Sequence, residues 1–89
     1  MKVRRHIVLS GRVQGVGLRY RAMHLAQSLG VTGWVRNGWD GRVEMELQGT
    51  SDEIALMLSK LHEGMFIQID NVESEEIPAV QESSFHIRG

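Results

Sequence analysis

The sequence predicts an α+β fold: an antiparallel sheet with both helices on one face, in the chain order strand, helix, strand, strand, helix, strand. Three observations support this. Residues 19–29 and 54–61 repeat apolar side chains every three or four positions, which is typical of helices. Residues 31–47 read as two β-type runs around an Asn-Gly and an Asp-Gly, which predicts a hairpin. Short β-type runs stand before the first helix and after the second.

The size and composition indicate one small domain, residues 1–89. The chain has no cysteine, which excludes disulfides, thiolate nucleophiles and cysteine-based zinc sites. No apolar run approaches the roughly 20 residues that a membrane-spanning helix needs. The first residues lack the pattern of a signal peptide. We expect a cytoplasmic protein that does not bind membranes.

The first strand is expected at residues 6–9, where His6-Ile7-Val8-Leu9 precedes Ser10-Gly11. A stretch with glycines at 11, 15 and 17 follows, and the helical pattern begins at or just after Arg19. This helix carries apolar residues at 22, 23, 26 and 29, and Gly30 is a suitable C-terminal stop.

The hairpin is expected to join Val31–Arg36 to Val43–Leu47. In the second of these strands, apolar residues alternate with Glu44, Glu46 and Gln48, which predicts one buried face and one solvent-exposed face.

A capping box, Thr50 with Glu53, predicts the start of the second helix, and Gly64 its end. A fourth strand is expected at residues 66–69. Whether it extends to Val72 through a bulge stays open. Residues 74–82, around the single proline, are expected to be irregular, and residues 85–87 to form a short final strand. This order is the ferredoxin-like, or split βαβ, arrangement, which many unrelated functions use.

Charge is divided sharply along the chain. Residues 1–42 hold eight of the ten Lys and Arg residues and one acid, whereas residues 43–89 hold the other ten acids. The basic half is nearly all arginine, which suits forked recognition of phosphate or carboxylate oxygens. Two interpretations stay open: an anionic ligand bound by the first half, or halves that interleave so that the charges pair on the surface.

The stretch from Gly11 to Arg19 carries the strongest chemical signal. A strand ends, three glycines follow and a helix starts, so free N–H groups and the positive end of the helix dipole meet there. Glycines allow consecutive amides to point inward together, and the fork of Arg19 could complete a cradle for a tetrahedral oxyanion. The spacing matches neither the Walker loop nor the dinucleotide fingerprint. On these grounds alone, a phosphate cradle and a plain glycine-rich turn both remain open.

Two longer motifs, residues 11–19 and residues 33–44, resemble signatures of the acylphosphatase family. They lie in the family's order and separation, and the resemblance extends over nearly the whole chain. They are Gly11-Arg12-Val13-Gln14-Gly15-Val16-Gly17-Leu18-Arg19 and Gly33-Trp34-Val35-Arg36-Asn37-Gly38-Trp39-Asp40-Gly41-Arg42-Val43-Glu44.

The resemblance implies a metal-free hydrolase of acyl phosphates with no organic cofactor. Arg19 matches the catalytic arginine that holds the phosphate, and Asn37 matches the asparagine that holds the attacking water. The cradle is matched by the backbone amides of Gln14, Gly15, Val16, Gly17 and Leu18. We expect a monomer whose ligands are an acyl phosphate and, as competing anions, phosphate or sulfate.

The chain departs from the family pattern at three places: Leu18 replaces the usual phenylalanine, Met65 follows Gly64 where proline is common, and Gly89 stands where many members keep an aromatic residue. We expect these changes to affect packing and local geometry more than catalysis.

Other residues carry weaker signals. The four histidines are scattered and predict no metal site. Glu44 and Glu46 are expected to face solvent rather than act as an acid/base pair. Trp39 could shield the acyl group or merely be exposed, and the roles of Arg12 and Arg36 stay open.

Two alternatives to a free-standing enzyme remain. A ferredoxin-like sheet with arginines could be a non-catalytic module that binds anions or RNA, or a regulatory domain, but the motif and aromatic content of RNA-recognition sheets are missing. Acylphosphatase-like domains also begin larger hydrogenase-maturation carbamoyltransferases, and the length of 89 residues favours the free-standing form.

Overall fold

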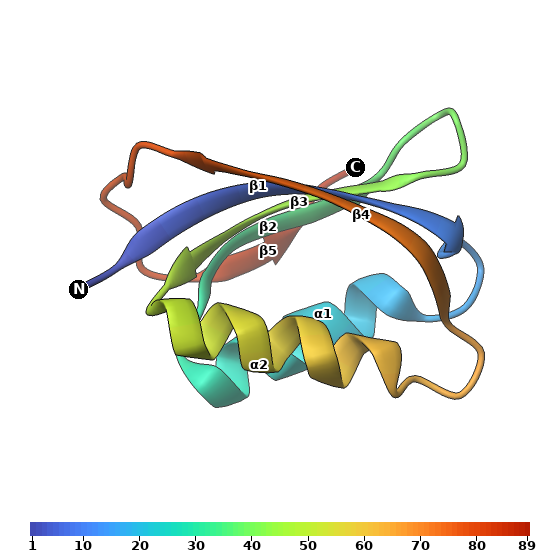
Figure 1. Ribbon diagram of the computed structural model, residues 1–89, viewed down its shortest axis with the longest axis horizontal. Helices are drawn as coiled ribbons and strands as arrows, with labels where there is room; N and C mark the ends of the chain where they lie inside the picture. The colour runs from blue at the N-terminus through green and yellow to red at the C-terminus, as the bar shows by residue number, and fades with distance from the viewer.

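The computed structural model describes residues 1–89 and has the predicted order of elements, with a fifth strand at the end (Figure 1). The elements are β1 Val3–Arg12, α1 Leu18–Leu29, β2 Thr32–Asn37, β3 Val43–Gly49, α2 Ser51–His62, β4 Gln68–Ile77 and β5 Phe85–Ile87. No helix is long and apolar enough to cross a membrane.

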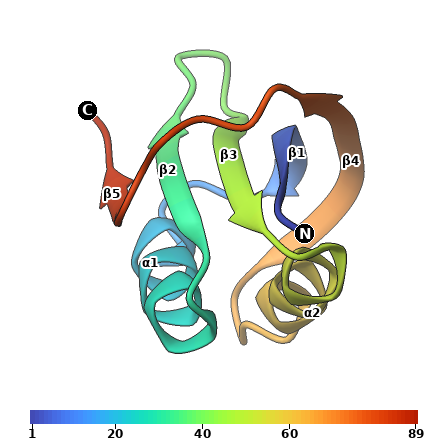
Figure 2. The same cartoon turned by 90° about the vertical axis from the view of Figure 1, so that its left-hand side faces the viewer.

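The strands form one sheet in the order β4-β1-β3-β2-β5, and both helices pack on the same face (Figures 1 and 2). The ferredoxin-like α+β fold is therefore confirmed. The sheet is mixed rather than wholly antiparallel, because β5 pairs in parallel with β2. After β4 the chain reverses direction and crosses the sheet to its far edge, where it forms β5 (Figure 2). Because β2 also runs opposite to β4, β5 lies parallel to β2.

Two strands are longer than their sequence patterns predicted. β1 begins at Val3 and continues past Ser10 to Arg12, because β3 and β4 pair with it on both sides. β4 continues to Ile77, so the expectation of irregular chain from residue 74 is wrong. The polar run Glu73–Glu76 gives no local strand signal, and only its pairing with β1 makes it a strand. A bulge near residue 70 shifts the β1–β4 register.

The core lies between the sheet and the helices. Ile7 and Leu9 of β1 and Met45 and Leu47 of β3 are fully buried, while the residues between them face the other side of the sheet. The helices close the core with residues at helical spacing, namely Leu18, Ala22 and Ala26 of α1 and Ile54, Met57 and Leu61 of α2.

The predicted end of α1 and the predicted start of α2 are present, whereas α2 ends at His62 with Glu63 as its C-cap, before the predicted Gly64. Gly30 ends α1 in the left-handed conformation with φ of 73°. The capping box of α2 has both bonds: the Glu53 N–H donates to the Thr50 hydroxyl at 3.1 Å, and the Thr50 N–H donates to the Glu53 carboxylate at 2.9 Å.

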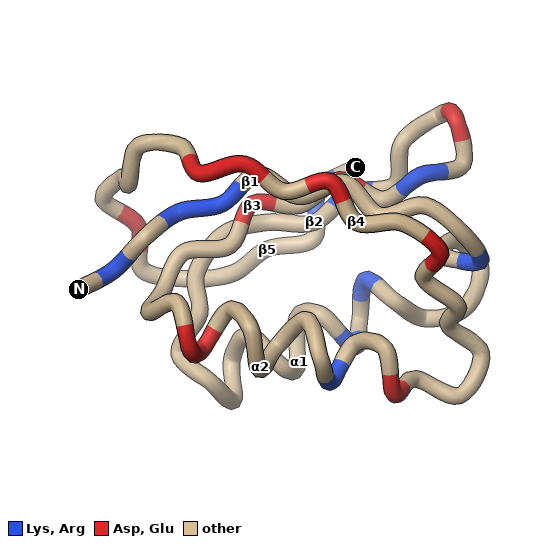
Figure 3. The backbone as a smooth tube through the Cα atoms, in the orientation of Figure 1, with Lys and Arg blue, Asp and Glu red and all other residues tan.

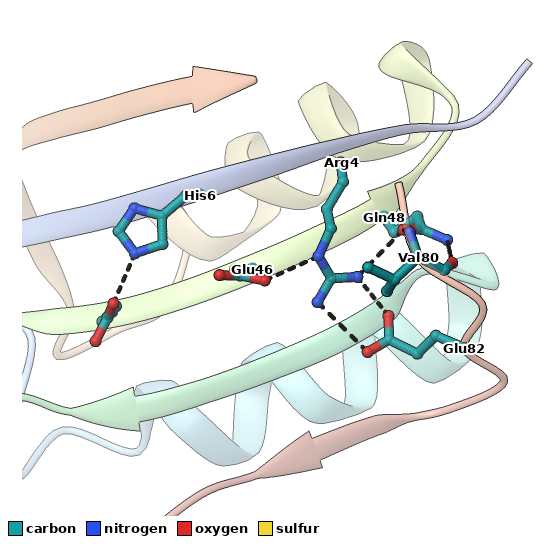
Figure 4. Close-up of polar contacts among 7 residues, drawn as sticks. Arg4, His6, Glu46, Gln48, Val80 and Glu82 are labelled. Carbon is teal, nitrogen blue, oxygen red and sulfur yellow. Dashed lines mark hydrogen bonds and ion pairs between the residues drawn. The ribbon is translucent and has the colours of Figure 1, made fainter. Parts of the chain in front are cut away.

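A buried arginine fastens the crossover to the outer face of the sheet, the face away from the helices (Figure 4). The Arg4 side chain is 4% exposed and donates to Glu46 of β3 at 2.8 Å and to Glu82 of the crossover at 2.7 Å. Beside it, the Gln48 amide donates to the Val80 carbonyl at 2.7 Å and accepts from the Val80 N–H at 2.9 Å. These contacts hold the segment that delivers β5 to β2.

The Arg4–Glu82 pair makes stability depend on pH. Burial alone would raise the pKa of Glu82, but the hydrogen bonds and positive charges around it, those of Arg4 foremost, together outweigh burial and lower that pKa. A carboxylate whose folded pKa lies below its unfolded value stabilises the fold above the unfolded pKa, about 4.3. That contribution is lost as the pH falls through the folded value.

We therefore expect Glu82→Gln to lower the free energy of unfolding at pH 7 by about 1–3 kcal/mol. The difference from the wild type should shrink below about pH 4. Urea denaturation at pH 7 and pH 3 measures both. The control is Glu76→Gln, because the Arg5–Glu76 pair is 3.9 Å long and exposed, so its removal should cost less than about 1 kcal/mol. An equal loss for Glu82→Gln at both pH values would contradict this assignment.

Candidate active site

Figure 3 shows where the Lys and Arg residues lie along the backbone. The arginines of the basic half fall into two groups, those whose side chains pair with carboxylates and those whose side chains do not. Four of them pair with carboxylates, namely Arg4, Arg5, Arg36 and Arg42. Arg21 donates to the Lys60 carbonyl at 2.6 and 3.1 Å. The interleaving interpretation therefore holds for most of the basic half. Arg12 and Arg19 make no ion pair, and Arg19 is half-buried in the first turn of α1.

The loop between β1 and α1 presents a row of unused amides. The N–H groups of residues 14–17 donate to no backbone or side-chain acceptor of the protein. Leu18 opens the helix, so its N–H has no intrahelical partner, and the first helical bond runs from the Arg21 N–H to the Gly17 carbonyl at 3.1 Å. An anion placed at this helix start would meet several donors and the positive end of the helix dipole.

Two glycines shape this loop. Gly15 and Gly17 have φ of 72° and 78°, in the left-handed region that other residues rarely adopt. A left-handed residue in a tight loop turns neighbouring amides inward as an anion-binding nest. Both glycines are exposed, and a Cβ added at either would meet nothing within 4 Å, so the nest is open to solvent.

Asn37, the last residue of β2, lies on the helix side of the sheet. It pairs with Val43, a core residue, whereas Arg36 pairs with Glu44 on the outer face. The Asn37 side-chain oxygen is buried without a hydrogen-bond donor from the protein. Such an unsatisfied acceptor is uncommon, and a bound water or ligand can satisfy it.

Gln14 joins the loop to the hairpin that follows Asn37. Its side-chain Nε2 donates to the Gly38 carbonyl at 2.6 Å and to the Arg42 carbonyl at 3.0 Å. The loop and the end of β2 are therefore directly connected. The sequence had indicated only the backbone amide of Gln14, because motif spacing carries no information about where a side chain reaches.

The largest hollow of the molecule lies on the outer face of the sheet. It measures about 640 Å³ and is lined by residues of β1, β2, β3 and the hairpin, including Asn37, His6 and Glu44, but by neither Arg19 nor residues 14–18. Trp39 at its rim is fully exposed. The loop at residues 14–18 lines no part of this hollow, and its glycines Gly15 and Gly17 are exposed at the surface.

The two outer-face acids of β3 are each engaged by hydrogen bonds from neighbouring side chains. Glu44 accepts from His6 at 2.6 Å and from Arg36 at 2.6 Å, and these bonds, that of His6 foremost, lower its pKa. Glu46 accepts from Arg4. No group of three or more His, Asp or Glu side chains is placed to hold a metal ion.

The fold and the loop define a class: small α+β sandwich domains with an open row of amides between the first strand and the first helix. Within this class, the acylphosphatase family model matches residues 5–87. The chain belongs to the acylphosphatase family and, with it, to the hydrolases that act on acyl phosphates.

Curated relatives and solved structures agree. An acylphosphatase of Bifidobacterium longum (strain NCC 2705) is 43% identical over 83 residues, which is 92% of this chain and 86% of that protein. One of Geobacillus thermodenitrificans is 43% identical over 72 residues, 80% of this chain and 77% of that protein. The structure of a Coxiella burnetii acylphosphatase superimposes with a TM-score of 0.89 at 36% identity, covering 98% and 93% of the two chains.

The same fold is also found within a larger protein. Full-length HypF in its phosphate- and nucleotide-bound form matches with a TM-score of 0.91 at 27% identity. All of this chain is covered, but only 12% of that one.

Proposed function

We propose that this chain cleaves the carboxyl–phosphate bond of acyl phosphates by capturing the phosphate at the start of α1 and directing a water at phosphorus. The observation that carries the proposal is the row of free amides at residues 14–17 beside the unpaired Arg19. This arrangement, fastened to the hairpin that follows Asn37, suits a tetrahedral anion.

The chemistry asks little of the protein. An acyl phosphate is a mixed anhydride whose leaving group is a carboxylate with a pKa of about 4. This group departs without a proton donor, so no general acid is needed. What remains is to stabilise charge on the phosphoryl oxygens and to place the nucleophile in line with the breaking bond.

Arg19 and the amides of residues 14–18 perform the first task. The fork of an arginine matches two phosphate oxygens, and the amides and helix dipole add fixed positive potential. Removal of one preorganised hydrogen-bond donor from such a site costs about 10²–10³ in rate.

Asn37 performs the second task. A carboxamide is too weak a base to remove a proton from water, so its side-chain oxygen accepts a hydrogen bond and orients the water. The water oxygen bonds to phosphorus while the bond from phosphorus to the acyl oxygen breaks. The electron pair of that bond stays on the carboxylate, and the water proton passes to a phosphoryl oxygen.

The RNA-binding alternative is not favoured. RNA-recognition sheets stack bases on aromatic side chains of their open face. Here the corresponding outer face carries paired charges, among them Glu44 with Arg36 and Glu46 with Arg4, in place of a row of stacking aromatics. Its one strand tryptophan, Trp34, is only 6% exposed and is flanked by Arg36 and Arg88.

The test is hydrolysis of benzoyl phosphate in the presence of EDTA, with p-nitrophenyl phosphate as the control. We expect metal-independent release of benzoate and phosphate, competitive inhibition by inorganic phosphate, and little turnover of the monoester, whose leaving group is poorer. Turnover that EDTA abolishes, or equal rates on the two compounds, would overturn the proposal.

A further inference from the structure

The Gln14 side chain closes a bridge between two parts of the candidate site. Its amide nitrogen carries two hydrogens, and both are used: one on the Gly38 carbonyl at 2.6 Å, the other on the Arg42 carbonyl at 3.0 Å. Two carbonyl oxygens require a donor, so the environment itself fixes which end of the amide faces the hairpin.

The two acceptors form the neck of the β2–β3 hairpin. The Gly38 N–H donates to the Arg42 carbonyl at 2.7 Å, so Gln14 reaches the pair of residues that closes the turn. Gly38 follows Asn37 directly in the chain. A shift of the neck would therefore move Asn37 as well.

No other side-chain hydrogen bond or ion pair joins residues 13–18 to the hairpin. The ends of the loop are held instead by apolar packing, since Val13 and Leu18 are each only 1% exposed in the core. Gln14 is thus the polar link that relates the cradle amides to Asn37, while the core sets only the general position of the loop.

We infer that Gln14 is a positioning residue: its side chain holds the hairpin neck against the cradle and so sets the place of the Asn37-held water relative to the captured phosphate. This inference rests on the proposed function. It gives Gln14 two tasks, a backbone amide directed at the anion and a side chain that acts through Asn37.

The expected kinetic effect is specific. Without the bridge, the amides of residues 15–18 and Arg19 still bind phosphate, but the water is held at a less favourable place. A displacement of about 1 Å can cost about 10²-fold in rate. Loss of Gln14 donors should therefore lower kcat by about 10- to 100-fold and leave phosphate affinity nearly unchanged.

The primary variant is Gln14→Met, which keeps the length of the side chain and removes both donors. The matched control is Gln68→Met, because the exposed Gln68 amide donates only to Asp70 at 3.0 Å on the surface of β4. Steady-state kinetics with benzoyl phosphate give kcat, and competition by inorganic phosphate gives its Kd. A kcat within twofold of the wild type would overturn the inference, and so would an equal loss of kcat and phosphate affinity.

A second variant tests the donor role directly and serves if Gln14→Met folds poorly. In Gln14→Glu, the ionised carboxylate cannot donate, whereas the protonated acid regains one donor. The ratio of its kcat to that of Gln14→Met should rise as the pH is lowered towards 4.5. If Gln14→Met does not fold, the wild type replaces it in this ratio. A ratio independent of pH would count against the bridge.

Two further measurements separate this inference from the proposed function. If Gln14 acts through Asn37, adding Gln14→Met to Asn37→Ala should cost less than threefold in kcat, and additive losses would overturn the coupling. Hydrogen exchange at the Gly38 N–H needs no substrate and should be faster in Gln14→Met but not in Gln68→Met. A wild-type protein that does not hydrolyse acyl phosphates would contradict the proposed function. An unchanged rate of hydrogen exchange at the Gly38 N–H in Gln14→Met would contradict the bridge.

Discussion

Arg19→Ala is expected to abolish both hydrolysis of benzoyl phosphate and binding of inorganic phosphate. Arg19 is a half-buried arginine of the basic half without an ion pair, and it stands in the first turn of the helix whose preceding amides are free. A guanidinium that neutralises phosphoryl oxygens in a transition state is worth about 10³–10⁵ in kcat. Because the arginine also holds the ground-state anion, affinity for phosphate should fall with the rate.

Two companion variants sharpen this test. Arg19→Lys keeps the charge but loses the fork, and we expect it to recover part of the phosphate affinity and little of kcat. Arg12→Ala removes a second unpaired arginine, exposed at the end of β1, and should change kcat by less than about 10-fold because it acts only through a screened field.

Benzoyl phosphate kinetics and calorimetric titration with phosphate measure both quantities, and circular dichroism verifies that the variants are folded. A folded Arg19→Ala protein with near-wild-type turnover would remove Arg19 from the mechanism.

Asn37→Ala is expected to lose about 10²-fold or more in kcat while it still binds phosphate. The Asn37 side chain makes no hydrogen bond within the protein, and its oxygen is buried without a donor. Truncation therefore breaks no internal hydrogen bond, and the amides of the loop and Arg19 keep their own positions. The residue acts on the water rather than on the anion, so the loss should appear in kcat alone.

The control is Asn71→Ala, which removes an exposed asparagine of β4 and should leave both constants unchanged. Phosphate competition and kcat are measured on the same preparations. If phosphate affinity collapses in Asn37→Ala, the residue binds the anion or supports the loop instead.

Local signals in the sequence predicted most of the fold. The capping box of Thr50 and Glu53, the glycine after α1 and the Asp-Gly pair of the hairpin turn act over a few residues, and each is present as expected. The exception is β4. Its polar half, Glu73–Glu76, became a strand because β1 offers it backbone partners, a long-range effect that a local pattern cannot carry. The parallel placement of β5 likewise depends on the crossover that Arg4 and Gln48 hold.

For the candidate site, the residue types and their order are evident without coordinates: the glycine-spaced loop, Arg19 at the helix start and Asn37 before the turn. The folded chain adds which arginines are engaged elsewhere, and that the Gln14 side chain reaches the hairpin neck. Loop conformation and helix capping depend on neighbours along the chain, so spacing reveals them. Pairing of charges and bridging by a side chain depend on which distant segments meet, and this is settled when the strands align in the sheet.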